Sequence, residues 1–373
     1  MKAARAAACG NARDQCTGGS MADEIGFGVL GLGMGKGHCR SVTEAVGAKL
    51  VAACELDAER LDPIVEEYGC KAYTDYDEML QDDEIQVVNV TVESGKHAEM
   101  AIKAAEAGKH IILEKPADIT TDKIDKLIAT VRDCKVKVGC IFQARTDDLN
   151  LAIKDAIDTK RIGKLIGVHG HLPWYRAQSY YEGAHGSWKG TWDIDGGGSL
   201  MNQGVHTVDL IQWLGGGVQS VMGMYGVFGH DIEAEDQTVA LLKFKNGALG
   251  TIYTTTCCYP GYDQLITIYG SEGSLMKDAS KLIGWRMKGE NEDGEEKEMM
   301  AKFGPKDERE ENVSADPTAL KPRGHTLIIQ DLVEAIHEDR DPLIQLESAR
   351  HPVAIINAIF ESSRSGREVQ IDG

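Results

Sequence analysis

The chain has 373 residues, of which 42% are hydrophobic and 27% are charged, and its formal net charge at pH 7 is -19. A chain of this length suggests two domains and can bury full cores without metals or disulfides. A surface this acidic repels nucleic-acid phosphates and anionic membranes, so neither is expected as a partner.

The first 20 residues, MKAARAAACGNARDQCTGGS, contain no continuous apolar segment. A secretory signal is therefore not expected. We interpret residues 1–20 as a disordered extension, with Met21 opening the first folded segment. Nine cysteines without framework spacing predict reduced thiols in a cytoplasmic protein. The sequence has no compact Cys/His ligand set, so no metal site is expected.

From Gly26 to about Gln143, short apolar runs alternate with amphipathic segments. The expected strands are 26–31, 49–54, 86–90, 109–113 and 136–142, and the expected helices are 35–46, 57–68, 75–82, 95–107 and 121–133. Such alternation predicts βαβ units around a parallel sheet. We therefore expect an α/β Rossmann domain over residues 21–145.

The first expected strand runs into a glycine-rich loop, 31–35 (GLGMG). Glycines there permit a tight turn and let the backbone approach a pyrophosphate at the N-terminus of the following helix. A strict GxGxxG motif would place its third glycine at position 36, where this chain has Lys36. The position of the loop between a strand and a helix still predicts a dinucleotide site. Its expected cofactor contacts are Gly31, Gly33, Met34 and Gly35.

Glu55 follows the second expected strand, 20 residues after Gly35. An acid at this place accepts hydrogen bonds from ribose hydroxyls and repels a 2′-phosphate. The pattern therefore predicts NAD as the cofactor and disfavours NADP. The alternative interpretation is an exposed carboxylate at the end of a strand.

The strand at 109–113 ends in Glu114-Lys115-Pro116. Ligands of open α/β sheets bind at the carboxyl ends of the strands, and the proline restricts Lys115 to extended conformations. Lys115 is thus a candidate active-site residue, although a lysine on the surface at the end of a strand fits the same pattern.

After about residue 146 the pattern changes to a run of strands with few helices between them. Helix 147–159 precedes strands at 164–172, 217–228, 236–244, 248–257 and 263–269, and helices 324–338 and 347–362 close the chain. Residues 288–312 are strongly charged and predict a solvated excursion. We expect a C-terminal α+β domain over 146–373, built on a large, mostly antiparallel open sheet, that binds substrate and supports oligomerisation. Its final helices can pack back on the Rossmann domain.

A glycine triplet, 196–198, opens an apolar-periodic helix that carries Asn202, His206 and Asp209. Residues four apart on a helix share a face, so Asn202 and His206 are expected side by side. A histidine beside a cofactor crevice can exchange a proton near neutral pH. A hydrogen-bonded core histidine is the alternative.

The glycine loop, the Glu-Lys-Pro tripeptide and the GGG…NxGxHxxD segment together resemble the Gfo/Idh/MocA oxidoreductases. The resemblance implies hydride transfer between a hydroxyl-bearing carbon of a sugar or polyol and the nicotinamide. It also implies that Lys115 contacts the reacting hydroxyl, that Glu114 and Lys115 help hold the cofactor, and that His206 is the general acid/base. Two positions depart from the family pattern: Asn202 replaces an aspartate, and Glu93 replaces a proline.

Substrate contacts are expected from Lys115, Arg145, Tyr175, Trp192, Asn202 and His206. Arg145 matches a family arginine that faces the pocket. Tyr175 and Trp192 belong to a loop crowded with aromatic residues, which suits a sugar ring but also suits a lid or a contact between subunits.

Two other functions remain open at this point. A redox-neutral enzyme would retain NAD, oxidise a glycoside transiently and then eliminate from it. A non-catalytic NAD-binding sensor is disfavoured, because it needs neither Lys115 nor His206. Relatives pair through the open sheet, so a homodimer or homotetramer is expected.

Overall fold

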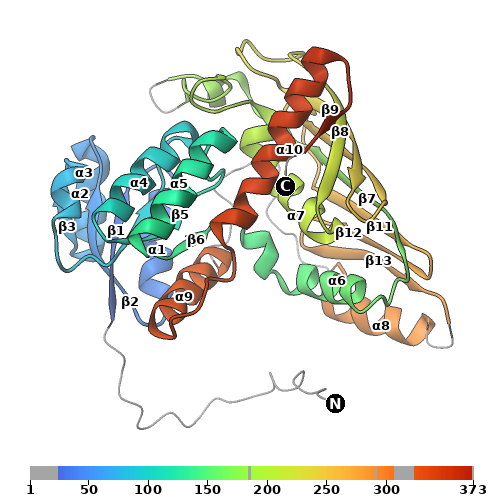
Figure 1. Ribbon diagram of the computed structural model, residues 1–373, viewed down its shortest axis with the longest axis horizontal. Helices are drawn as coiled ribbons and strands as arrows, with labels where there is room; N and C mark the ends of the chain where they lie inside the picture. Colours follow the sequence, from blue (N-terminus) through green and yellow to red (C-terminus); the bar gives the residue numbers. More distant parts are fainter. Residues whose placement is uncertain (1–23, 184–185, 290–291, 306–322, 372–373) are drawn as a thin grey trace, which may run out of the picture.

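The computed structural model describes residues 24–183, 186–289, 292–305 and 323–371 (Figure 1). The expectation of a disordered extension at residues 1–20 lies outside the described residues. None of the described helices is long and apolar enough to cross a membrane.

The N-terminal half is a parallel sheet of six strands in the order β3-β2-β1-β4-β5-β6. Its strands are β1 (Ile25–Leu30), β2 (Ala48–Cys54), β3 (Lys71–Tyr73), β4 (Val87–Val90), β5 (His110–Leu113) and β6 (Val138–Cys140). The sheet confirms the predicted Rossmann fold. β3 was not predicted, because a three-residue strand at the edge of the sheet leaves no periodic signal.

The connecting helices are α1 (Gly35–Glu44), α2 (Ala58–Tyr68), α3 (Tyr76–Leu80), α4 (His97–Glu106) and α5 (Thr121–Cys134). Local sequence explains their ends. For α2, the Asp57 carboxylate accepts a hydrogen bond from Glu59 N at 3.0 Å, and Gly69 ends the helix with a φ of 65°.

The C-terminal half is built on an eight-stranded sheet in the order β13-β12-β11-β7-β10-β9-β8-β14. Its strands are β7 (Leu165–Pro173), β8 (Val218–Gly226), β9 (Gln237–Phe244), β10 (Leu249–Thr255), β11 (Leu265–Gly270), β12 (Gly273–Asp278), β13 (Lys281–Met287) and β14 (Val369–Gln370). All neighbouring pairs are antiparallel except β7 with β10. The predicted mostly antiparallel sheet is therefore confirmed.

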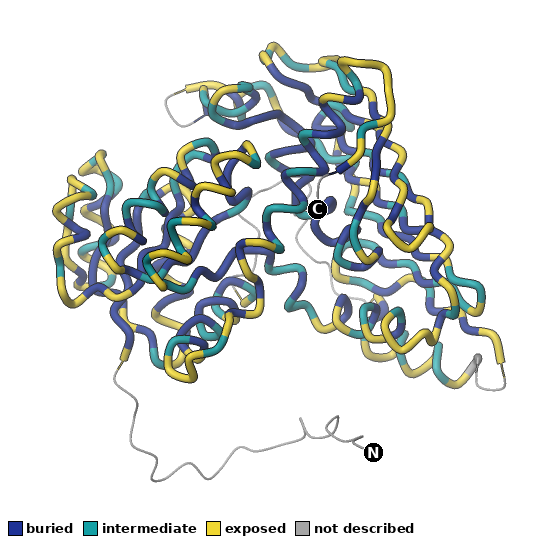
Figure 2. The backbone as a smooth tube through the Cα atoms, in the orientation of Figure 1, coloured by how far each residue is buried: buried dark blue, intermediate teal, exposed yellow. Residues whose placement is uncertain are grey.

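One face of this sheet is covered by helices. α7 (Val205–Gly215) packs on β7, and α10 (Leu346–Ser365) packs on β8 (Figure 1). Buried and exposed residues alternate along β9 and along most of β8, and the exposed residues face the opposite side of the sheet, which we call the outer face (Figure 2). α6 (Asp148–Asp158) leads from the Rossmann sheet into β7.

The closing helices connect the two halves. α9 (Arg323–His337) packs on α1 and β6, and α10 packs on both α5 and β8. The end of the chain thus ties the second half back to the Rossmann sheet.

The expectation of a solvated excursion over residues 288–312 is wrong for its first part. Residues Glu292–Phe303 form helix α8, which packs on β13. Met299, Met300 and Phe303 are partly buried against the core, and these few apolar side chains hold a helix that is otherwise charged. Residues 306–312 lie outside the described part of the chain.

Candidate active site

A cavity of about 610 Å³ lies where the carboxyl ends of the Rossmann strands meet the second half. From the Rossmann side it is lined by the glycine loop, Glu55, Arg60, Thr91, Glu93, Glu114 and Lys115. From the second half it is lined by Trp174, Arg176, Tyr180, Trp188, Lys189, Asn202, Gln203, His206 and His325. The motifs singled out in the sequence therefore meet around one space.

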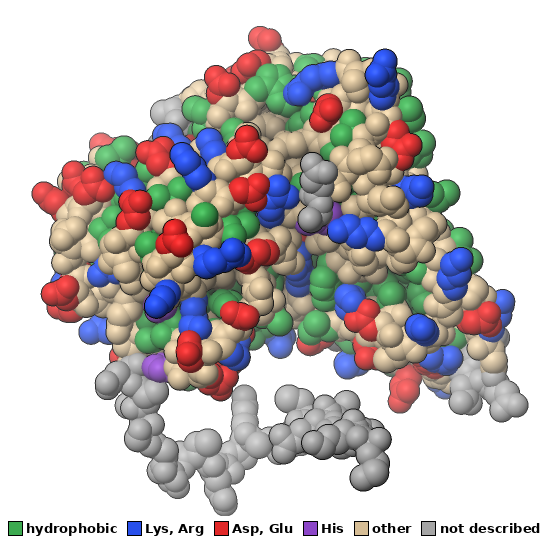
Figure 3. All heavy atoms as spheres, viewed as in Figure 1, with side chains coloured by type: hydrophobic (Ala, Val, Ile, Leu, Met, Phe, Trp, Pro, Cys, Tyr) green, Lys and Arg blue, Asp and Glu red, His purple; other side chains and the backbone are tan. Residues whose placement is uncertain are grey.

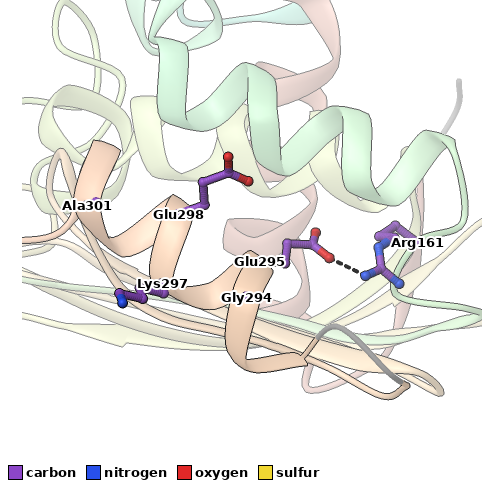
Figure 4. Close-up of a pocket in the computed structure, with 6 residues that line it drawn as sticks. All are labelled: Arg161, Gly294, Glu295, Lys297, Glu298 and Ala301. Carbon is purple, nitrogen blue, oxygen red and sulfur yellow. Dashed lines mark hydrogen bonds and ion pairs between the residues drawn. The ribbon is translucent and has the colours of Figure 1, made fainter.

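A second hollow, of about 670 Å³, lies on α8 next to Arg161 (Figure 4). Arg161 already forms an ion pair with Glu295 there. The remaining lining residues are exposed and are either small or charged: Gly294, Lys297, Glu298 and Ala301. Acidic and basic side chains are interspersed over the face of the molecule in Figure 3. The sequence motifs line the interdomain cavity and not the hollow on α8, so the interdomain cavity is the candidate site.

The glycine loop is shaped for close backbone approach. Gly31 has a φ of 85°, and its carbonyl oxygen accepts a hydrogen bond from Thr91 Oγ1 at 2.6 Å. A Cβ atom at Gly35 would lie 2.7 Å from Thr91 Oγ1, so a larger residue does not fit. Met34, at the start of α1, provides no side-chain cap. The first-turn amides of α1 therefore suit the pyrophosphate of a dinucleotide. Gly31, Gly33 and Met34 line the cavity, whereas Gly35 packs behind it.

Glu55 lies at the end of β2 beside this loop. Its Oε2 accepts a hydrogen bond from Leu32 N at 2.8 Å, and its Oε1 accepts one from Leu56 N at 2.9 Å. Arg60 Nη1 lies 3.5 Å from Oε2. The carboxylate is thus fixed at the edge of the cavity, where it can accept from ribose hydroxyls.

Lys115 is held from two sides. Its backbone N–H donates to Glu114 Oε2 at 2.9 Å, and its Nζ donates to the backbone oxygen of Asn202 at 3.1 Å. Glu114 Oε1 in turn accepts from His38 Nε2 at 3.0 Å and lies 3.3 Å from His325 Nε2. Burial alone would raise the pKa of Glu114, but His325 and His38 hold it well below its usual range. Glu114 is therefore an ionised anchor for Lys115.

The glycine triplet leads into a π-helix, Ser199–Gln203, followed directly by α7. Buried Glu235 holds the start of this π-helix. Its carboxylate accepts from Gly198 N at 3.0 Å, from Leu200 N at 2.8 Å and from Ser199 Oγ at 2.6 Å. The carboxylate thus satisfies amides that a helix start leaves without partners and fixes the segment that carries Asn202.

Asn202 and His206 both line the cavity. Asn202 Nδ2 donates to Asp195 Oδ1 at 2.7 Å, and burial raises the pKa of Asp195 to about 7. Burial and the neighbouring Lys115 lower the pKa of His206 to about 3, so its imidazole is neutral at physiological pH. Nδ1 of His206 is buried and has no hydrogen-bond partner among the described residues.

His206 is one of several side chains around the cavity with an unsatisfied polar atom. The others in the described residues are Gln143 Oε1, Trp174 Nε1 and Gln203 Oε1. A buried polar atom without a partner costs free energy, which a ligand's hydroxyl groups can recover. This clustering marks the cavity as a site for a polar ligand.

Three expected substrate contacts, Arg145, Tyr175 and Trp192, are not among the residues that line the cavity. Arg145 forms a buried ion pair with Asp209 and donates from Nη1 to Ser348 Oγ at 2.7 Å, so it ties helices together. The ring of Tyr175 packs on Tyr259 with centroids 5.2 Å apart. Trp192 packs on Phe360 at 5.1 Å.

The aromatic loop nonetheless contributes to the cavity through other members. Trp174, Tyr180 and Trp188 line it, as does Arg176, which is 5% exposed. Residue types alone did not separate these from Tyr175 and Trp192, because the loop has no regular period to assign faces. Lys189, Gln143, Gln203 and His325 also line the cavity and were missed, since lone polar residues carry no motif.

Two segments of the chain match a known family. Residues 25–142 match the oxidoreductase family with an NAD-binding Rossmann fold, and residues 150–276 match the GFO/IDH/MocA C-terminal domain.

Individual relatives agree with this match. The chain is 28% identical to myo-inositol 2-dehydrogenase of Thermotoga maritima over 68% of this chain and 75% of that protein. It is 26% identical to levoglucosan dehydrogenase of Pseudarthrobacter phenanthrenivorans over 68% of this chain and 73% of that protein. Among solved structures, the WlbA dehydrogenase from Bordetella pertussis, in complex with NADH and UDP-GlcNAcA, superposes with a TM-score of 0.83. The superposition covers 94% of this chain and 99% of that one at 27% identity.

Proposed function

Because the chain belongs to the GFO/IDH/MocA oxidoreductase family, we propose that it is an NAD-dependent dehydrogenase that oxidises a CH–OH group of a sugar or polyol. Lys115 and His206 handle the proton. The observation that carries the proposal is their convergence, from separate halves of the chain, on the cavity that the glycine loop also lines.

The cofactor is assigned to the Rossmann side of the cavity. Gly31, Gly33 and Met34 receive the pyrophosphate, supported from behind by Gly35, and Glu55 accepts from the adenosine ribose. A nicotinamide bound there would supply the acceptor for a hydride from the carbon that bears the substrate hydroxyl. Glu114 contributes indirectly, since it fixes the backbone of Lys115.

The protein's own part is to bind the hydroxyl and remove its proton. Lys115 donates to the hydroxyl oxygen and stabilises the negative charge that develops on it. His206 is neutral, so the ring nitrogen that carries no proton can accept the hydroxyl proton. The O–H bond breaks as the C–H bond electrons leave with the hydride, and the carbon becomes a carbonyl. Asn202 positions both partners, through its backbone oxygen to Lys115 and its place one turn before His206.

The substrate class follows from the unsatisfied polar atoms and aromatic faces together. Gln143, Trp174, Gln203 and His206 offer hydrogen-bonding atoms, while Trp188 offers a flat face, which is the chemistry that a polyhydroxylated ring requires. The names of the inositol and levoglucosan dehydrogenase relatives support the same class.

The test is the absorbance of NADH when the purified full chain and NAD meet a panel of sugars, polyols, sugar acids and glycosides. We expect steady NADH formation with one class. Consumption of a glycoside without NADH formation would support the redox-neutral alternative. NAD binding without turnover of any compound would leave the sensor interpretation.

We further propose that residues 21–145 form the cofactor domain and residues 146–373 the substrate domain, with α9 and α10 joined to both. The cysteines among the described residues are all free, which supports a reducing compartment such as the cytoplasm.

The outer face of the second sheet supports a homodimer or homotetramer. Met222 pairs with Leu241 and Met224 with Val239 across β8 and β9, and these four side chains are 47%, 57%, 77% and 47% exposed, respectively. Contiguous exposed apolar side chains on a sheet mark an interaction surface. We propose that a second copy of the chain covers this face.

A further inference from the structure

The substrate end of the cavity carries two cations, Arg176 and Lys189. The guanidinium carbon of Arg176 lies 4.9 Å from the ring centroid of Trp174 and 5.5 Å from that of Tyr180. Lys189 Nζ lies 3.7 Å from the centroid of the same Tyr180 ring. Both residues line the cavity, so their charges bear on whatever binds there.

Arg176 is fixed from both sides of its peptide unit. Its N–H donates to the carbonyl oxygen of Thr256 at 2.8 Å, and its own carbonyl oxygen accepts from His230 Nε2 at 2.8 Å. His230 is in turn held by Asp236, with Nδ1 3.2 Å from the carboxylate. The guanidinium is held as well, because Nη1 donates to the carbonyl oxygen of Tyr175 at 2.8 Å, so the side chain loses little conformational freedom when a ligand arrives.

Lys189 is partly buried, and its Nζ has no hydrogen bond or ion pair within the ranges that the structure describes. Burial lowers the pKa of Lys189, the buried Asp195 opposes this effect, and the nearby Arg176 adds to it. Placing two like charges together in a partly enclosed space costs free energy, and a bound anion would offset that cost.

The distribution of acids supports the same conclusion. The chain carries 59 acidic and 40 basic residues. Nevertheless, the described residues that line the cavity from the second half include no aspartate or glutamate. Asp195, whose charge acts on Lys189, is fully buried and already accepts hydrogen bonds from Gly190 N and Asn202 Nδ2. Although the chain is acidic overall, the described residues that line this end of the cavity carry no carboxylate.

We propose that Arg176 and Lys189 form an anion subsite that binds a carboxylate or phosphate group of the sugar substrate. The inference rests on the proposed function, since it names the substrate class of the same site. Trp174 and Trp188, which line the same end, would contact the ring of the sugar. An anionic group on the sugar would offset the repulsion between the two cations beside the Tyr180 ring.

The test is calorimetric binding to the NADH complex of the full chain, in which an alcohol substrate cannot be oxidised. Three pairs of ligands are compared: D-glucuronate with D-glucose, UDP-glucuronate with UDP-glucose, and glucose 6-phosphate with D-glucose. The first two pairs differ only by a carboxylate and the third by a phosphate, so the pairs distinguish the two sources of charge.

We expect the anionic member of at least one pair to bind roughly tenfold more tightly than its neutral partner. Lys189→Met should remove most of that difference, and Lys189→Arg should restore it. Lys126→Met, on the exposed surface of α5, is the matched control and should keep it. Equal binding within all three pairs, or the same result for Lys189→Met and Lys126→Met, would overturn the subsite.

The subsite and the dehydrogenase can fail separately. NADH formation with neutral and anionic sugars at equal kcat/KM would overturn the subsite and leave the dehydrogenase standing. Tight binding of one anionic ligand, lost in Lys189→Met, without NADH formation from any sugar would support the subsite and count against the dehydrogenase.

Discussion

Lys115 at the end of β5 donates a hydrogen bond from its ammonium group to the backbone oxygen of Asn202, 3.1 Å away in the other half of the chain. A backbone oxygen is present whatever side chain occupies position 202. The replacement of the family's aspartate by Asn202 therefore leaves this anchor of Lys115 intact. A carboxylate still lies next to this position, because the side chain of Asn202 donates a hydrogen bond to Asp195.

The first prediction concerns Lys115. Lys115→Met keeps much of the side-chain volume but removes the charge that stabilises the developing alkoxide. We expect kcat to fall by about 10²–10³-fold, as for the loss of one preorganised donor, with the dissociation constant for NAD changed only a few-fold. Steady-state kinetics and NAD titration check this, with Lys126→Met as control. A kcat within threefold of wild type would remove Lys115 from the catalytic assignment.

The second prediction concerns His206. Its pKa of about 3 means that the imidazole is in its proton-accepting form from about pH 4 upward. We expect His206→Ala to lower kcat by about 10²–10⁴-fold. In the wild type, kcat/KM should show no loss from His206 protonation between pH 5 and 8. Asp195 and Glu235, each with a pKa of about 7, can titrate in that range.

The pH profile of the Asp195→Asn variant separates Asp195 from His206. A midpoint near pH 6.5 that persists in this variant and disappears when His206→Ala is added would show that His206 titrates normally. That outcome would contradict the structural account of its burial.

The sequence predicted the elements with long periodic patterns and missed those set by distant contacts. The Rossmann strands were located within about two residues, because buried parallel strands have continuous apolar runs. β12 and β13 were missed, because their glycines, lysines and single apolar residues show no clear alternation.

The site shows the same division. Lys115 and His206 belong to motifs with fixed spacing, and both were located in the cavity. Arg145 does not line the cavity, because it pairs with Asp209, 64 residues away, and no local pattern reveals which acid an arginine will meet. The choice between Trp174 and Trp192 depended on the path of an irregular loop, which only the folded chain defines.

The third prediction concerns the choice of cofactor. Glu55 repels a 2′-phosphate, and Arg60 lies 3.5 Å from its carboxylate. In Glu55→Ser the repulsion is lost and Arg60 can pair with the phosphate instead. We expect the ratio of kcat/KM for NAD to that for NADP to fall at least about tenfold, which corresponds to ~1.4 kcal/mol. Glu59→Ser, at an exposed position on α2 next to Arg60, is the control and should leave the ratio unchanged. An unchanged ratio in Glu55→Ser would show that Glu55 does not select the cofactor.

The fourth prediction concerns the outer face of the second sheet. Leu241 is 57% exposed and lies beside Met222 in the sheet. Leu241→Glu places a charge in the proposed contact between subunits, so we expect light scattering after gel filtration to show a smaller species. Val46→Glu, at a 73% exposed residue in the Rossmann half, is the control. A monomeric wild type, or a Leu241→Glu variant of unchanged mass, would contradict this interface.

The last prediction concerns Glu235 and pH. Burial raises the pKa of Glu235 from 4.5 to about 7. The folded state therefore binds the proton more tightly than the unfolded chain, so the contribution of Glu235 to stability is full below pH 4.5 and is lost as the pH rises toward 7. At ~1.4 kcal/mol for each tenfold change in proton affinity, the loss is at most about 3 kcal/mol. Glu235→Gln lacks this titration.

Glutamine can also keep the contacts of Glu235, because its oxygen accepts from Gly198 N and Leu200 N while its amide donates to the hydroxyls of Ser199 and Thr238. The wild type loses stability as Glu235 ionises, and Glu235→Gln does not. We therefore expect the free energy of unfolding of Glu235→Gln minus that of the wild type to increase from pH 5 to pH 8. Denaturant unfolding at the two pH values measures it, with exposed Glu233→Gln as the matched control. If the difference from wild type is the same at both pH values, the pKa of Glu235 is not raised. Glu235 would then hold the π-helix as an ionised carboxylate at both pH values.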